Sequence, residues 1–147
     1  MKKIILMFIL SVPTFLFSQK SDENNTSRIL KEDFKFPYNH PEKGNLGFYV
    51  KKEIKLKDGA DKDVIVKINS GPIKEELLNK VNFCCFDINI KYLLSRTMSN
   101  LKNKYTFIPR EIYIYYVELD NSWEISVSYS AQNDFGALKD GYNKMKF

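Results

Sequence analysis

The segment at residues 123–131 alternates between apolar and polar side chains without interruption. Neighbouring side chains of a β-strand point to opposite faces of a sheet, so this period predicts a strand with one buried and one solvent-facing side. The predicted buried side consists of Trp123, Ile125, Val127, Tyr129 and Ala131. The predicted solvent-facing side consists of Glu124, Ser126, Ser128 and Ser130. The C-terminal third of the chain is therefore predicted to be an antiparallel sheet.

A second strand is predicted directly before it, at residues 111–119, because this segment is rich in β-branched and aromatic residues. The residues between the two strands, 120–122, are Asp, Asn and Ser, which favour a turn. Both faces of the 111–119 strand are apolar, which leaves two interpretations open. Tyr113 and Tyr115 either form an exposed partner surface or are covered as part of a central strand.

The first 18 residues have the layout of a secretory signal peptide. Lys2 and Lys3 precede an apolar stretch at residues 4–17, and Ser18 is the small residue best placed for cleavage. This stretch is shorter than the roughly 18 to 20 residues that a membrane-spanning helix needs, so we expect cleavage rather than anchoring. Membrane contact is expected only through an uncleaved signal segment, and the expected location is periplasmic or secreted.

The net charge gives no reason to expect a nucleic-acid partner. The full chain carries a formal charge of +5, and loss of the two lysines of the signal segment leaves +3. The remaining charges of both signs are interspersed along the chain rather than clustered. Nucleic-acid binding is therefore not predicted.

A flexible leader and an irregular arm are predicted for residues 19–45. The beginning of this segment is polar, and Pro37, Pro41 and Gly44 oppose regular structure in its later part. A single α+β domain is predicted for residues 46–147. It begins with a hairpin whose strands, at residues 46–56 and 64–68, are joined by a charged turn that contains an Asp-Gly pair.

Helices are predicted between this hairpin and the C-terminal strands. Pro72 suits the first turn of one helix. The next segment is ambiguous, because residues 86–92 alternate like a strand while the apolar residues from Ile90 to Leu101 have helical spacing. The longer pattern favours a helix at residues 88–102. The predicted fold is α+β, with an antiparallel sheet of four or five strands and one or two helices on one face.

Few residues indicate chemistry. His40 is the only histidine, and a solvent-exposed loop position is favoured over a catalytic pair with a cysteine. Zinc usually takes three or four His or Cys ligands, and His40, Cys84 and Cys85 are the only such residues in the chain. We therefore predict no catalytic residue, no metal site and no cofactor. The adjacent cysteines could be buried thiols, a strained disulfide, or reactive or intermolecular thiols.

The strand pattern ends at Ala131, and residues suited to a corner follow. Asn133 can hydrogen-bond to its own backbone, and Gly136 accepts a positive φ angle. Residues 129–141 resemble a segment, Tyr-x-Ala-x-Asn-x-aromatic-Gly-Ala, that recurs near the C-terminus of small exported bacterial proteins and lipoproteins of unknown function. The resemblance implies an α+β sheet but no defined activity. Corner formation is favoured over binding for Asn133 and Gly136.

The expected function is non-enzymatic, namely a small envelope or secreted module that binds another protein, such as a second envelope protein. The alternatives are a small hydrolase-type enzyme with an unrecognised site and a structural accessory protein of the cell envelope. An exposed aromatic patch would favour binding, and a cleft that joins His40 to a carboxylate or thiol would favour an enzyme. The candidate binding residues are Tyr113, Tyr115, Asn133, Phe135 and Gly136.

Overall fold

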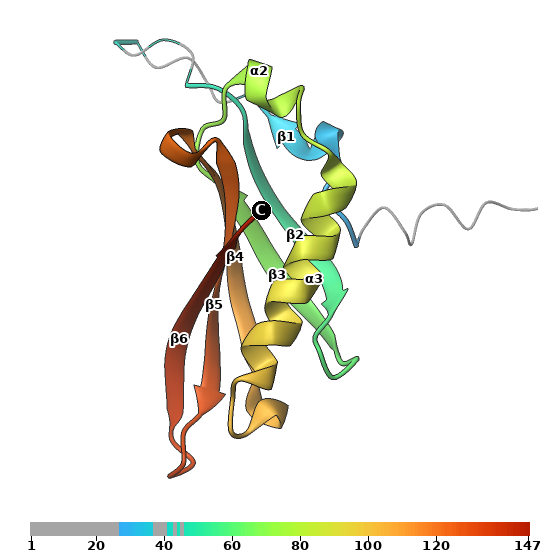
Figure 1. Ribbon diagram of the computed structural model, residues 1–147, viewed down its shortest axis with the longest axis vertical. Coiled ribbons are helices and arrows are strands. Elements are labelled where there is room, and N and C mark those ends of the chain that lie inside the picture. Colours follow the sequence, from blue (N-terminus) through green and yellow to red (C-terminus); the bar gives the residue numbers. More distant parts are fainter. Residues whose placement is uncertain (1–26, 37–40, 43, 45) are drawn as a thin grey trace, which may run out of the picture.

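The computed structural model describes residues 27–36, 41, 42, 44 and 46–147. Within them, six strands form one sheet, and one long helix, α3, crosses one of its faces (Figure 1). The strands are β1 (Phe34–Lys35), β2 (Tyr49–Lys57), β3 (Asp63–Ser70), β4 (Ile108–Val117), β5 (Ser122–Gln132) and β6 (Leu138–Lys146). The helices are α2 (Glu75–Leu78) and α3 (Phe83–Ser99), with short 3-10 turns η1 (Lys31–Asp33), η2 (Lys104–Thr106) and η3 (Glu118–Asp120).

The strands follow one another across the sheet in sequence order, β1-β2-β3-β4-β5-β6. All neighbouring pairs are antiparallel except the central pair, β3 and β4, which is parallel. A parallel pair requires a crossover connection, and α2 and α3 lie in that connection. The α+β class is confirmed, but the sheet is mixed rather than purely antiparallel.

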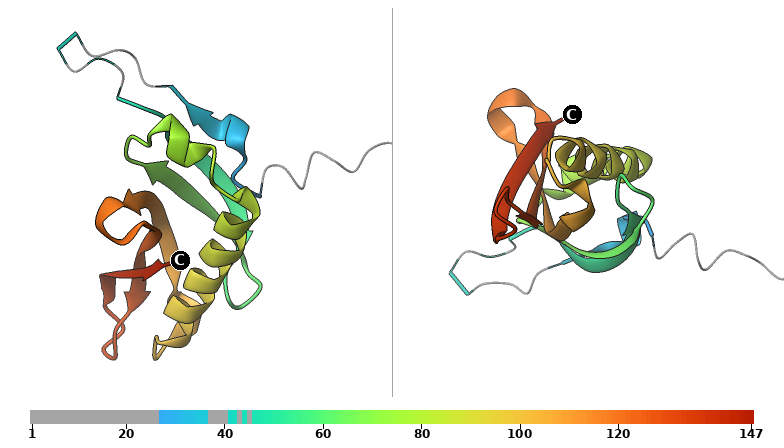
Figure 2. Two further views of the ribbon diagram at one scale, coloured as in Figure 1. Left: turned by 45° about the horizontal axis from the view of Figure 1, so that its top comes forward. Right: turned by 90° about the horizontal axis from the view of Figure 1, so that it is seen from below.

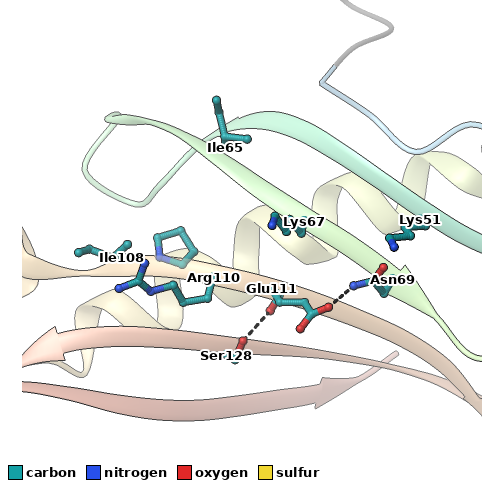
Figure 3. Close-up of a pocket in the computed structure, with 9 residues that line it drawn as sticks. Lys51, Ile65, Lys67, Asn69, Ile108, Arg110, Glu111 and Ser128 are labelled. Atoms are coloured by element: carbon teal, nitrogen blue, oxygen red, sulfur yellow. Dashed lines mark hydrogen bonds between the residues drawn. The ribbon is translucent and has the colours of Figure 1, made fainter.

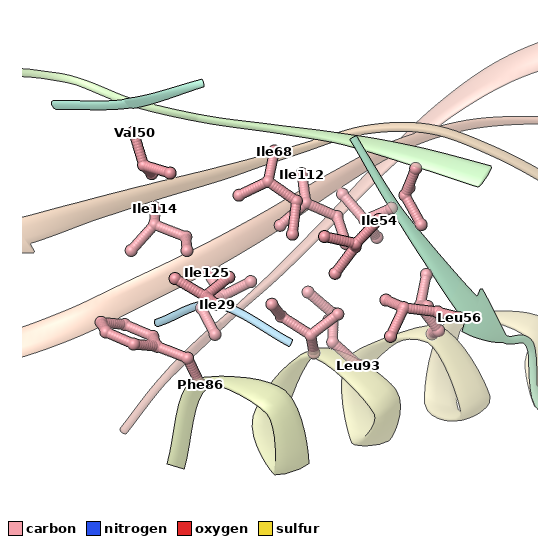
Figure 4. Packing of buried hydrophobic residues seen from close by; sticks show 14 of the residues in the cluster. Ile29, Val50, Ile54, Leu56, Ile68, Phe86, Leu93, Ile112, Ile114 and Ile125 are labelled. Carbon is pink, nitrogen blue, oxygen red and sulfur yellow. The ribbon is translucent and has the colours of Figure 1, made fainter. Parts of the chain in front are cut away.

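The hydrophobic core lies between α3 and the face of the sheet that it covers (Figure 4). Figure 2 shows the sheet bending around α3, so the helix occupies the concave side. The helix contributes the fully buried Phe86, Ile90, Leu93 and Leu94. The sheet contributes Val50, Ile54, Leu56, Val66, Ile68, Ile112, Ile114, Ile125 and Val127. The helical spacing of the first set and the alternation of the second produce two complementary apolar surfaces.

The residues before β2 also contribute to this core. Ile29 is 1% exposed and Phe34 is 6% exposed. Phe34 pairs with Val50 at the edge of the sheet, and its ring makes an edge-on contact with Phe83 at 5.7 Å between centroids. The segment at residues 29–35 is therefore packed against the domain, although the sequence predicts an irregular arm there.

The ambiguity at residues 86–92 is resolved in favour of the helix. The helix begins at Phe83, earlier than predicted, because the Asn82 side chain caps it by accepting a hydrogen bond from the Cys84 backbone N–H at 3.3 Å. It ends at Ser99, slightly before the predicted end. The helix predicted after Pro72 is reduced to the single turn of α2.

The predicted strand number is too low, because the two edge strands lack a clear periodic signal. β1 has only two residues. β6 has nine, but most of them are polar or charged, which is typical of an edge strand and obscures the alternation. β6 is nevertheless anchored to α3, since the Asn143 side-chain amide donates to Thr97 Oγ1 at 2.9 Å.

The predicted solvent-facing side of β5 is wrong for three of its four residues. The three buried residues are Glu124, Ser126 and Ser130, with exposed fractions of 2%, 3% and 1%. β5 lies between β4 and β6, and long side chains on those strands flank these three residues. Tyr115 is paired with Glu124, and Lys144 is paired with Ser126. Cross-strand neighbours, rather than a second layer, cover this side of β5.

Two predicted features cannot be placed in this fold. The predicted signal peptide, residues 1–18, and His40 both lie outside the described residues. Among the described helices, none combines the length and the apolar character that a membrane crossing requires.

We predict that two adjacent positions of β5 respond oppositely to a new charge. Val127 is fully buried against α3, whereas Ser128 remains partly exposed. Val127→Asp should unfold the domain, because typical stabilities are about 5 to 15 kcal/mol and an unpaired buried charge costs several of these. Ser128→Asp should cost at most about 1 kcal/mol. Urea unfolding measures both, and equal tolerance would contradict the placement of this strand.

Candidate functional site

The face of the sheet opposite α3 is covered by no helix of the described residues, and we call it the open face (Figures 1 and 2). Its side chains come from β2 to β6, at alternate positions of each strand. They include Lys51, Glu53, Lys55, Ile65, Lys67, Asn69, Glu111, Tyr113, Tyr115, Glu124, Ser126, Ser128, Ser130, Tyr142 and Lys144. This face therefore combines aromatic side chains with charges of both signs.

The two predicted tyrosines both lie on the open face, with ring centroids 5.9 Å apart. Tyr115 is partly buried, and its hydroxyl donates a hydrogen bond to the Glu124 carboxylate. Lys144 Nζ lies 3.1 Å from the same carboxylate. A buried carboxylate is tolerated when it is paired and hydrogen-bonded, and these two groups provide that. Tyr115 is thus held within the sheet, whereas Tyr113 is 40% exposed and available for contact.

The other three predicted residues lie in the turn between β5 and β6. Asn133 Oδ1 accepts hydrogen bonds from the backbone N–H groups of Phe135 and Ala137, each at 3.0 Å. Gly136 has a φ of 77°, the left-handed region that glycine adopts readily. Asn133 and Gly136 therefore have local interactions that shape the turn, and Phe135 is 93% exposed at its tip.

The turn and the tyrosines do not form one site. Tyr113 is paired with Ser126 of β5, seven residues before Asn133, which directly follows the end of that strand. Because a strand rises about 3.3 Å per residue, the turn lies roughly 20 Å from Tyr113. The five candidate residues are thus divided between the open face and the end of the β5–β6 hairpin.

The structure adds a feature that the sequence did not indicate, a shallow depression of about 730 Å³ on the open face (Figure 3). We call it the basic depression. It is lined by Lys51, Ile65, Lys67, Asn69, Ile108, Pro109, Arg110, Glu111 and Ser128. These residues come from β2, β3, β4 and β5. They include three cations, Lys51, Lys67 and Arg110, but only one carboxylate, that of Glu111.

The position of Arg110 results from a β-bulge, since the register of β4 against β5 shifts between Pro109 and Glu111. A bulge adds a residue and redirects a side chain. Arg110 Nε donates to Ser130 Oγ at 3.0 Å, and Ser130 Oγ donates to Asp140 at 2.6 Å. The terminal guanidinium nitrogens have no hydrogen bond within the described part of the chain. Arg110 is therefore oriented by its Nε while its other donors remain available.

The two lysines of the depression are weakly neutralised. Lys67 Nζ lies 4.0 Å from the Glu53 carboxylate, which is a long ion pair. Lys51 has no ion pair with any residue that the structure describes. The one carboxylate of the lining, Glu111, accepts a hydrogen bond from the Asn69 side chain. The depression consequently carries net positive charge.

The cysteines are both free thiols in the first turn of α3. Cys84 is exposed and Cys85 is partly buried. Burial raises the pKa of the Cys85 thiol, and the neighbouring Cys84 raises it further. The interpretation of two buried thiols therefore does not hold for Cys84. Within the described ranges, no three His, Cys, Asp or Glu side chains are grouped so that they could hold a metal ion.

We compared the chain with protein-family models, with curated proteins and with solved structures, and none of these comparisons found a match. Function is therefore inferred from the chemistry of the open face.

We predict that the two neighbouring tyrosines differ in their contribution to stability. Tyr115→Phe removes a donor from the buried Glu124, so it should destabilise the protein by about 1 to 3 kcal/mol. Tyr113→Phe is the matched control, because the Tyr113 hydroxyl makes no hydrogen bond among the described residues, and it should change stability by less than about 0.5 kcal/mol. Chemical denaturation of both variants tests this. An equal effect would mean that Glu124 does not depend on Tyr115.

Proposed function

We propose that this protein is an exported, non-enzymatic module that binds another protein through its open face. The observation that carries the proposal is the presence of large apolar side chains on this face beside incompletely neutralised cations. Ile65 is 69% exposed, Tyr142 is 60% exposed and Tyr113 is 40% exposed. Aromatic residues and arginine are enriched where proteins contact one another, and the open face carries both exposed tyrosines and Arg110.

The rigidity of this surface supports binding. The exposed tyrosines and Arg110 are attached to strands of a sheet whose other face is packed against α3, so their backbone positions are fixed. Side chains on a rigid support lose less freedom when a partner binds, which favours affinity. Single exposed apolar residues are common on protein surfaces, but here Ile65 lines a charged depression, and Tyr113 and Tyr142 are paired with Asn69 and Ser128 of the same lining.

Export is the part of the proposal that rests on the sequence alone. It is supported by Lys2, Lys3 and the apolar stretch at residues 4–17. A periplasmic or secreted location would bring the open face into contact with other envelope proteins.

We predict that the native protein lacks its first 18 residues. A cleaved signal peptide leaves a shorter chain, which intact-mass measurement of the protein purified from its own cells detects directly. A mass that includes residues 1–17 would contradict export with cleavage, and the protein would then retain an N-terminal apolar segment.

We predict that partner binding depends on the open face and not on the outer surface of α3. Crosslinking in the native cell, followed by mass spectrometry, should identify a partner that is lost when Tyr113 and Tyr142 are both replaced by Ala. Tyr92→Ala is the matched control, because Tyr92 is 57% exposed on the helix, on the other side of the molecule from the open face.

The comparison between variants decides the result. A partner that is retained by Tyr92→Ala and lost from the double variant supports the proposal. Partners that are unaffected by the double variant, or lost only with Tyr92→Ala, would place the binding surface elsewhere.

A further inference from the structure

We infer that the basic depression binds the carboxylate of an acidic, extended segment of a protein partner, an inference that deepens the proposed function and rests on it. The sequence does not indicate this site, because its cations are separated along the chain. They are brought together only by the pairing of β2 with β3 and of β3 with β4 (Figure 3).

The charge of the depression favours a carboxylate ligand. Lys51, Lys67 and Arg110 provide three positive charges, against the single negative charge of Glu111. The Glu111 carboxylate is already engaged by Asn69. A guanidinium donates two parallel hydrogen bonds to a carboxylate, and such charge-assisted pairs are among the stronger contacts in proteins.

Arg110 is prepared for this role before any ligand arrives. The bulge redirects its side chain, and the hydrogen bond from Nε to the buried Ser130 restrains it. The donors that remain are the terminal nitrogens, which are those used in carboxylate recognition. An arginine that is already oriented loses less conformational entropy when the ligand binds.

The apolar residues of the lining indicate that the ligand also has apolar side chains. Ile65 on β3 is 69% exposed and Ile108 on β4 is 39% exposed, and both line the depression beside the cations. An extended peptide whose acidic and apolar residues stand two positions apart presents both kinds of side chain on one face, because alternate side chains of an extended chain share a face. Such a segment would place its carboxylate near Arg110 and its apolar side chain against the isoleucines.

The acidic residues of the same face argue against a dense polyanion, such as a nucleic acid or an anionic lipid surface. Glu111 lies in the lining, and Glu53 and Asp63 lie on the adjoining strands β2 and β3. A ligand with closely spaced charges would meet these carboxylates as well as the cations. A protein segment with separated carboxylates avoids that repulsion.

The experiment is an NMR titration of the purified protein with two short blocked peptides, Leu-Ser-Glu-Ser-Leu and its neutral counterpart Leu-Ser-Gln-Ser-Leu, in which the apolar and acidic or amide side chains share one face of the extended chain. The acidic peptide should shift the amide signals around Lys67 and Arg110, with a Kd on the order of 1 mM or lower. The neutral peptide should bind at least about tenfold more weakly. Raising the salt concentration should weaken the binding of the acidic peptide, because salt screens the attraction between exposed charges.

Charge-removing variants locate the site. The double variant Lys67→Gln with Arg110→Gln should bind the acidic peptide about tenfold more weakly, or weaker still. Arg110→Lys should bind with intermediate affinity, since it retains the charge but loses the planar fork. Lys62→Gln is the matched control, because Lys62 is exposed in the β2–β3 turn, outside the depression, and it should bind as the unaltered protein does. The same spectra show whether each variant is folded.

Several outcomes would overturn the inference. These are equal binding of the two peptides, equal binding by the double variant, shifts located outside the depression, or tighter binding of inorganic tripolyphosphate or anionic lipid vesicles than of the peptide. Failure of this inference is distinguishable from failure of the proposed function. If a crosslinked partner depends on Tyr113 and Tyr142 but the acidic peptide does not bind, this inference fails and the proposed function stands. If the peptide binds but no partner depends on the two tyrosines, the proposed function fails and the depression still binds a carboxylate.

Discussion

The parallel pairing of β3 and β4 determines where α3 packs. As a consequence, one face of the sheet is covered by the helix and the other face has no second layer within the described residues. Parallel strands require the chain to return from one end of the sheet to the other, and α3 makes that return across a single face. Its apolar side then covers the strands, and Phe86 makes edge-on contacts with Trp123 and Phe147 at 5.2 and 5.6 Å between ring centroids. The opposite face is left without a second layer, so polar cross-strand contacts must stabilise it.

These contacts also shape the part of the open face on which the proposed function rests. Tyr115 and Lys144 together satisfy Glu124, and Ser130 links Arg110 to Asp140. The same network that makes polar residues tolerable in the sheet also determines which side chains are restrained and which remain available. Arg110 belongs both to this network and to the proposed binding site, because its Nε is bonded to Ser130 while its terminal nitrogens are not used by the network.

The elements that the sequence predicts are those whose signal is local. The alternation of β5 identifies its helix-facing side, and the spacing from Ile90 onward identifies α3. Edge strands lack that signal, because one of their sides and one of their edges face solvent, and most residues of β6 can therefore be polar or charged. The parallel pairing is a long-range property. The burial of Glu124 follows from the size of its neighbours on other strands, which no periodicity of β5 records.

The same distinction applies to the candidate site. Tyr113 and Tyr115 are indicated by the unusual apolar character of both faces of one strand. The basic depression is assembled from four strands, and the orientation of Arg110 depends on a bulge, so neither leaves a motif in the sequence. Asn133 and Gly136 are recognisable as turn residues because their hydrogen bonds and φ angle are local properties.

The anchoring of β6 has a further consequence for how molecules of this protein meet. Trp123 and Phe147 exchange both backbone hydrogen bonds, at 3.1 and 2.9 Å, so by alternation the N–H of Lys144 points away from β5. That N–H donates to Asn143 Oδ1 at 2.9 Å, while the amide of the same side chain is held by Thr97. The backbone N–H of Lys144 is therefore not available to pair with a strand added at this edge. The outermost strand is thereby a less complete template for sheet extension between copies.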